Sequence, residues 1–313
     1  MKKITVFILL IGLFLYTHNS AIASTYSTTL TDKDSNLNNV TLRQDLLCLM
    51  LAYPEYILNI EGNDQEGIYL LMKSGRKLLY DDKRNKSSDQ KLANPDLQDT
   101  LEQVYPLSTV RNILDKDFDP GRCRVYGLLT EVYGTSKQSV ESKLINVNAG
   151  NNHYQFNGNN KAADSLHAVM SELLPLAQGN STIRNCIFPC SGTFNYRIIA
   201  GTNQLSPHSF GIAIDLAVNK GDYWKWSSRE TAEKRLSTYP SEIVEAFEKN
   251  NFIWGGKWGH FDIMHFEYRP EIVLKARYFK EKQNSEELWY EGAPIQEVSV
   301  KNLIEKINLA LRK

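Results

Sequence analysis

Three potential metal ligands stand out in the second half of the sequence. His208 and Asp215 lie seven positions apart, and His265 follows fifty positions after Asp215. Between the first two, the apolar residues 212–214 favour a strand that is entered through a tight turn at Gly211. Because adjacent strands bring distant residues together, a ligand on this turn, one on the strand and one on a later strand can converge on a single ion.

Two imidazoles and one carboxylate form a donor set that suits zinc, whereas calcium and magnesium sites use more oxygen ligands. Three protein ligands also leave one position open, as in catalytic rather than closed structural zinc sites. The sequence therefore predicts a hydrolytic Zn²⁺ centre held by His208, Asp215 and His265. The nearby His260 is a candidate for supporting a ligand or facing the substrate.

Two carboxylates beside His265 are candidates for the general base that such a centre needs. On a regular strand His265 and Glu267 share a face, whereas Asp262 does not, which favours Glu267. A loop or bulge before His265 reverses this preference, and Gly259 indicates that the approach is not a plain strand. The residues alone leave both alternatives open.

Substrate contacts are predicted from residue type. Arg197 is a candidate for binding a carbonyl or carboxylate, with a surface salt bridge as the alternative. Ser206 is a candidate for a hydrogen bond in the site, with shaping of the turn as the alternative. Trp254 and Trp258 are candidates for lining the cleft, although large aromatic residues are more often part of a core.

The two motifs together resemble the zinc D-alanyl-D-alanine carboxypeptidase family of bacterial cell-wall peptidases. That family includes VanY-type carboxypeptidases and phage endolysins that cut L-alanyl-D-glutamate bonds. The resemblance covers roughly residues 160–278, and the motifs agree with the family in residue type, order and spacing. They are Ser206-x-His208-x-x-Gly211-x-Ala213-x-Asp215 and Asp262-x-x-His265-Phe266-Glu267.

The resemblance implies an α+β fold with a small antiparallel sheet flanked by helices, as in the hedgehog signalling domain. It implies that Asp262 is the catalytic base and that Arg197 is a catalytic residue that binds substrate. Ser206, Trp258 and Glu267 are our further predicted substrate-binding residues. The implied substrates are peptidoglycan stem peptides, cut either at terminal D-alanine or at L-Ala-D-Glu, and an aspartate as base favours the second. The alternative is a non-catalytic wall-binding module with a structural zinc site.

The N-terminal segment predicts an exported protein. Residues 1–23 have a basic start, an apolar run and a small-x-small cleavage pattern, which is typical of a secretory signal peptide. Cleavage leaves 34 basic and 36 acidic residues, which gives no electrostatic footprint for nucleic acid. No later apolar run is long enough to span a membrane, so we expect a secreted or extracytoplasmic protein without membrane attachment. Oligomeric state stays open.

The mature chain is predicted to contain three regions. Residues 24–150 form an N-terminal α/β extension of unknown role, 151–285 the zinc peptidase domain and 286–313 a helical tail. Helical periodicity predicts helices over 41–58 and 162–176.

Turn chemistry and composition add three local predictions. A hairpin is expected over residues 68–80, around Ser74-Gly75, and an Asn/Gly-rich connector over 148–160. Export and close spacing also predict a disulfide between Cys186 and Cys190.

Overall fold

The computed structural model describes residues 39–63, 66–150, 152–280 and 288–311. The predicted signal peptide, residues 1–23, lies outside these residues. Helices and small antiparallel sheets are mixed along the described chain, so the predicted α+β class is confirmed. Among the described residues, none of the helices has the length and apolar character that a membrane span requires.

Within the described residues, the strands form three separate antiparallel sheets, with the orders β1-β2-β3, β4-β5 and β6-β8-β7. The strands are β1 (Ile57–Asn63), β2 (Gly67–Met72), β3 (Lys77–Leu79), β4 (Leu144–Ala149), β5 (Asn152–Asn157), β6 (Ala213–Asp215), β7 (Phe252–Trp254) and β8 (His265–Tyr268).

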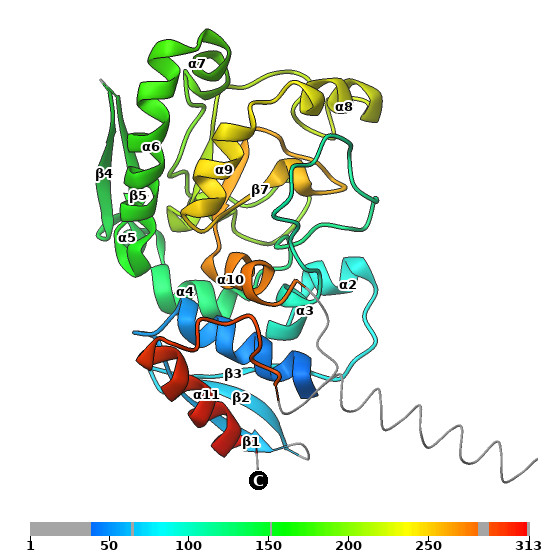
Figure 1. The fold of residues 1–313 in the computed structure, drawn as a ribbon, viewed down its shortest axis with the longest axis vertical. Helices are drawn as coiled ribbons and strands as arrows, with labels where there is room; N and C mark the ends of the chain where they lie inside the picture. The colour runs from blue at the N-terminus through cyan, green and yellow to red at the C-terminus, as the bar shows by residue number, and fades with distance from the viewer. Residues whose placement is uncertain (1–38, 64–65, 151, 281–287, 312–313) are drawn as a thin grey trace, which may run out of the picture.

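The helices flank these sheets on several sides (Figure 1). An unlabelled helix over residues 39–52 comes first. The others are α2 (Ser88–Ala93), α3 (Leu97–Leu101), α4 (Tyr126–Tyr133), α5 (Lys137–Glu141), α6 (Ala162–Gly179), α7 (Ser181–Ile187), α8 (Arg229–Ser237), α9 (Ser241–Lys249), α10 (Pro270–Tyr278) and α11 (Val298–Ala310), with short 3₁₀ turns η1 (Asn159–Lys161), η2 (Pro207–Phe210) and η3 (Gly255–Lys257).

The first sheet, the helix over 39–52 and α11 lie together at one end of the molecule, and α10 lies between them and the third sheet (Figure 1). The predicted hairpin over 68–80 is confirmed as β2–β3. The predicted helix over 41–58 ends at residue 52, because the chain turns at Pro54 and enters β1. The helix predicted over 162–176 is confirmed as α6.

The predicted connector over residues 148–160 is wrong, because β4 and β5 pair as a hairpin there. Its inward residues Val147 and Phe156 are buried in the core, and the hairpin packs against α6. Buried side chains on one face thus outweigh the turn-forming composition of the segment.

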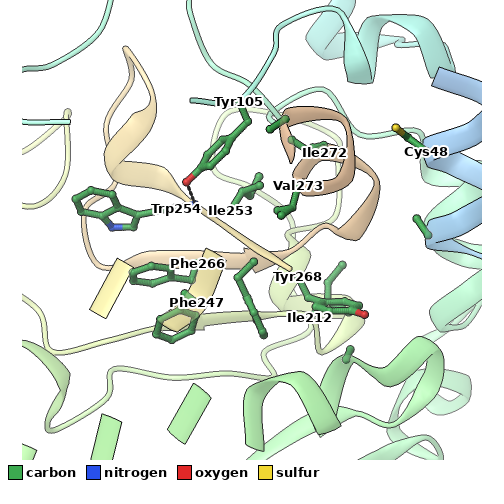
Figure 2. Packing of buried hydrophobic residues seen from close by; sticks show 14 of the residues in the cluster. Cys48, Tyr105, Ile212, Phe247, Ile253, Trp254, Phe266, Tyr268, Ile272 and Val273 are labelled. Carbon is green, nitrogen blue, oxygen red and sulfur yellow. Dashed lines mark hydrogen bonds between the residues drawn. The ribbon is translucent and has the colours of Figure 1, made fainter. Parts of the chain in front are cut away.

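The third sheet, with β8 at its centre, has an apolar face that packs on α9. Phe266 of β8 stacks on Phe247 of α9, with ring centroids 3.9 Å apart, and Trp254 of β7 lies beside them (Figure 2). The Tyr105 hydroxyl accepts a 3.0 Å hydrogen bond from the Trp254 backbone N–H, which anchors the N-terminal region to this sheet. Because side chains alternate along a strand, His265 and Glu267 project from the opposite face of β8.

Candidate metal centre

A glycine turn aims the first predicted ligand. His208 lies in η2, and Gly211 then adopts a left-handed conformation (φ +66°) before the chain enters β6. A Cβ at Gly211 would come within 2.7 Å of a Leu144 side-chain carbon, so the position favours glycine both in conformation and in space. The turn predicted at this position is therefore present.

Strand pairing brings the other two ligands to the same place. Asp215 at the end of β6 lies directly opposite His265 at the start of β8. The Asp215 carboxylate is 2.7 Å from His265 Nδ1 and 3.2 Å from His208 Nε2. The ligand atoms of all three residues lie within 4.8 Å of one another, and both imidazoles are buried.

The outer nitrogen of each imidazole is occupied by an acceptor. His208 Nδ1 donates to the Thr193 carbonyl at 2.5 Å, and His265 Nε2 donates to the Glu267 carboxylate at 3.0 Å. These contacts orient His208 Nε2 and His265 Nδ1 toward Asp215. Metal-binding histidines in proteins are held in this way, with the second ring nitrogen bonded to a carbonyl or carboxylate.

The electrostatics of the cluster favour a positive charge at its centre. Burial opposes ionisation of His265, but Asp215 and Glu267 outweigh burial and raise its pKa to about 10. Burial likewise opposes the charge on Asp215, yet hydrogen bonds from His208 and His265 hold its pKa well below the usual range. Two imidazoles and a carboxylate at this spacing fit a Zn²⁺ ion, which would replace the proton as the central positive charge.

Asp262 lies one turn before His265. Its carbonyl accepts the His265 backbone N–H at 3.1 Å. The backbone of Asp262 also forms an isolated β-bridge with Tyr223. The approach to β8 is thus a turn, so strand alternation does not apply to Asp262. Its Oδ1 is buried and has no hydrogen-bond partner within the part of the chain that the structure describes. Burial, opposed by His265 and helped by the charge of Asp215, raises the pKa of Asp262 to about 7.

Glu267 is enclosed on the other side of His265, with a side-chain exposure of 0%. Its carboxylate accepts two hydrogen bonds from the Arg124 guanidinium, one from Nε at 3.1 Å and a shorter one from Nη2. Burial opposes its charge, but Arg124 and His265 hold its pKa well below the usual range. The shared strand face is as expected, but it places Glu267 against the outer nitrogen of His265.

The remaining candidates lie around the centre at different depths. Arg197 is exposed, and its carbonyl accepts the Ser206 backbone N–H at 2.9 Å, so both residues belong to the turn that carries His208. Ser206 itself is buried. Trp254 and Trp258 both belong to the buried core, and the ring centroid of Trp258 lies 5.8 Å from that of His265.

Three residues near the centre carry no sequence pattern that would single them out. Asp119 accepts hydrogen bonds from the backbone N–H of His260 at 2.9 Å and pairs with its Nδ1 at 2.7 Å. The backbone of Tyr223 forms a β-bridge with that of Asp262. The Arg124 guanidinium binds the Glu267 carboxylate from 143 positions away in the sequence. The sequence offered only the general rule that a buried carboxylate needs a cationic partner.

The comparisons with known proteins concern the segment that carries the three candidate ligands. Residues 200–268 match a family model described as D-alanyl-D-alanine carboxypeptidase. The predicted resemblance is confirmed. The match contains His208, Asp215, Asp262 and His265 but begins after Arg197, and it is shorter than the resemblance expected over 160–278. Neither the curated proteins nor the solved structures gave a match.

The family match supports a peptidase of the cell-wall type in general terms.

The predicted Cys186–Cys190 disulfide is wrong, because all four cysteines are free thiols. The two thiols have different neighbours: Cys186 Sγ lies 3.6 Å from the Arg235 guanidinium, and Cys190 Sγ donates to the Ile187 carbonyl at 3.3 Å. These contacts turn the two side chains to separate partners.

Proposed function

We propose that this chain is a secreted zinc peptidase that hydrolyses a peptide bond in peptidoglycan stem peptides. The observation that carries the proposal is the convergence of His208, Asp215 and His265 beside the unpartnered carboxylate oxygen of Asp262. A structural zinc site has no use for a buried carboxylate of this kind, whereas hydrolysis requires a proton acceptor next to the ion.

His208 Nε2, Asp215 and His265 Nδ1 would hold the zinc. When bound, the ion supplies Lewis-acid activation of water and polarisation of the scissile carbonyl. The protein keeps these ligands in place through the Thr193 carbonyl and the Glu267 carboxylate, which fix the orientation of the two rings. Both rings are buried, so the ligands do not have to be ordered when the substrate arrives.

Asp262 would act as the general base. Its carboxylate accepts a proton from the attacking water and delivers it to the leaving amine, which would otherwise depart as a poor anion. Burial raises the pKa of Asp262 to about 7 in the metal-free protein, which makes its carboxylate a stronger base than an ordinary aspartate. Glu267 is unsuited to this role, because it is fully buried and its oxygens already accept hydrogen bonds from Arg124 and His265. We therefore assign Glu267 to positioning, in place of substrate binding.

Arg197 is the proposed contact for a substrate carboxylate or carbonyl, because it is exposed on the turn next to His208. Burial makes Ser206 and Trp258 candidates for shaping the pocket beneath the substrate, and their direct contact with it stays a prediction. The description of the matching family favours removal of a terminal D-alanine, whereas the aspartate at position 262 favours the L-Ala-D-Glu endopeptidase branch.

Mass spectrometry of muropeptides after digestion tests the proposal. Loss of a terminal alanine identifies the carboxypeptidase, and a cut between L-alanine and D-glutamate identifies the endopeptidase. Each activity should disappear on chelation and return with Zn²⁺. If zinc-loaded protein leaves the stem peptides unchanged but sediments with cell walls, the non-catalytic binding module is correct and the proposed peptidase is refuted.

A further inference from the structure

We infer that Arg124, from the N-terminal region outside the family match, is a positioning residue for the metal ligand His265 and acts through Glu267. The inference rests on the proposed zinc centre. It gives residues 24–150 a role in the site itself, because one of their side chains would complete the support of a ligand 141 positions later in the chain.

The contacts form a short buried chain. Both donors of the Arg124 fork meet Glu267, Nε on Oε2 at 3.1 Å and Nη2 on Oε1. The same Oε1 accepts His265 Nε2 at 3.0 Å. Side-chain exposures are 9% for Arg124 and 0% for Glu267, so water does not replace either partner. A bidentate pair fixes the plane of a carboxylate, and this plane sets the direction in which Glu267 accepts from the ring.

A second arginine does not duplicate this function. Arg269 lies 3.6 Å from Glu267 Oε2, but its Nε donates to Glu271 at 2.7 Å and its Nη1 to the Gly121 carbonyl at 2.7 Å. The other oxygen of Glu271 accepts the Tyr53 hydroxyl at 2.7 Å. Arg269 therefore joins the site to the N-terminal region, while the direct bidentate contact to Glu267 comes from Arg124.

The segment that carries Arg124 is fitted closely to the rest of the site. Gly121 has a φ of +88°, and a Cβ there would come within 2.4 Å of Ile253 of β7 and 2.8 Å of Ile272 of α10. Next to it, the Pro120 carbonyl accepts the Trp258 indole N–H at 2.7 Å. The loop thus packs directly on the sheet that holds His265, which gives Arg124 a fixed origin.

Zinc affinity of the full chain tests the inference. Arg124→Gln keeps a polar side chain but removes the charged fork, and we expect zinc binding, measured by competition with a chromophoric chelator, to weaken about 10- to 100-fold. Arg124→Lys keeps the charge without the fork, so its zinc affinity should lie between those of the native protein and Arg124→Gln. The d–d absorption of Co²⁺-loaded protein should change in Arg124→Gln, because the orientation of one ligand is lost.

Lys275→Gln is the matched control. Lys275 of α10 forms a buried pair with Asp45 of the helix over 39–52, at 2.6 Å, so it also joins the N-terminal region to the C-terminal half. It has no contact with a ligand in the pairs that the structure records. We expect Lys275→Gln to lower the thermal unfolding temperature while leaving zinc affinity and the Co²⁺ spectrum unchanged.

Unchanged zinc affinity in a folded Arg124→Gln overturns the inference, and so does an equal loss in Lys275→Gln, which would indicate a purely structural role. If Arg124→Gln does not fold, Arg124→Lys decides by the same two criteria. Failure of the native protein to bind zinc would instead refute the proposed metal centre, so the two failures are distinguishable.

Discussion

Asp262→Asn should separate metal binding from hydrolysis. The substitution keeps the size of the side chain and removes its basicity, so zinc content should remain near one ion per chain. General acid–base help is typically worth about 100- to 10,000-fold in rate, and we expect kcat/KM on stem peptides to fall by about that factor. This corresponds to roughly 3–5 kcal/mol of transition-state stabilisation, at about 1.4 kcal/mol per factor of ten.

The structure also gives the pH dependence of this contribution. With a pKa of about 7 in the metal-free protein, about half of Asp262 is in the basic form at pH 7 and about a tenth at pH 6. Activity of the zinc-loaded protein should fall about tenfold per pH unit below the pKa that Asp262 has with the ion bound. A bound dication stabilises the carboxylate and lowers the pKa, so loading with zinc should move the acid limb to lower pH.

The assay is kcat/KM between pH 5 and 9 at saturating zinc, with bound metal measured at each pH. Asp262→Asn should lose the acid limb along with the rate. Glu267→Gln is the comparison, because strand alternation alone nominates Glu267. It should bind zinc more weakly and unfold more easily, yet at saturating zinc retain more activity than Asp262→Asn. The reverse order of activities would show that Glu267 is the base and that our assignment is wrong.

Two further predictions concern the ligands and the cysteines. His208→Ala or His265→Ala should remove tightly bound zinc, as measured by metal analysis of the purified protein; zinc retained in both variants at the native level would exclude the assigned ligands. Thiol titration of the denatured, unreduced protein should give four thiols per chain, because all four are free. A count of only two thiols in that titration would show that a disulfide is present after all. In the folded protein Cys48 should react last, since it is buried and burial raises the pKa of its thiol well above the usual value.

The three ligand candidates could be predicted because their positions follow from local rules. Gly211 permits the turn that presents His208, and the short apolar run after it forms β6, which ends at Asp215. The antiparallel partner then places His265 opposite Asp215. The choice of base was harder, because it depended on whether the segment before His265 is a strand or a turn. Alternation correctly put Glu267 on the face of His265, but the identity of its neighbours decides what it does there.

Segments with weak or mixed patterns were not predictable. β1 follows directly after a helix and a turn at Pro54, so its first residues extend the helical pattern. The hairpin β4–β5 is rich in asparagine, and its inward side chains give little contrast without knowledge of α6, against which they pack. In both cases the stabilising contacts come from another element, α11 for β1 and α6 for the hairpin, and propensity is a weak guide when burial decides.

The N-terminal region shows the same limit in its strongest form. A fully buried carboxylate is costly unless a cation compensates it, so Glu267 at 0% exposure requires a partner such as Arg124. The sequence contains 36 basic residues, and nothing local to Arg124 distinguishes it from the others. Only the packing of the loop around Gly121 on β7 and α10 selects it. A segment without a cluster of catalytic residue types can therefore still contribute to a candidate metal centre, because the charge of a buried carboxylate has to be balanced from wherever the fold supplies a cation.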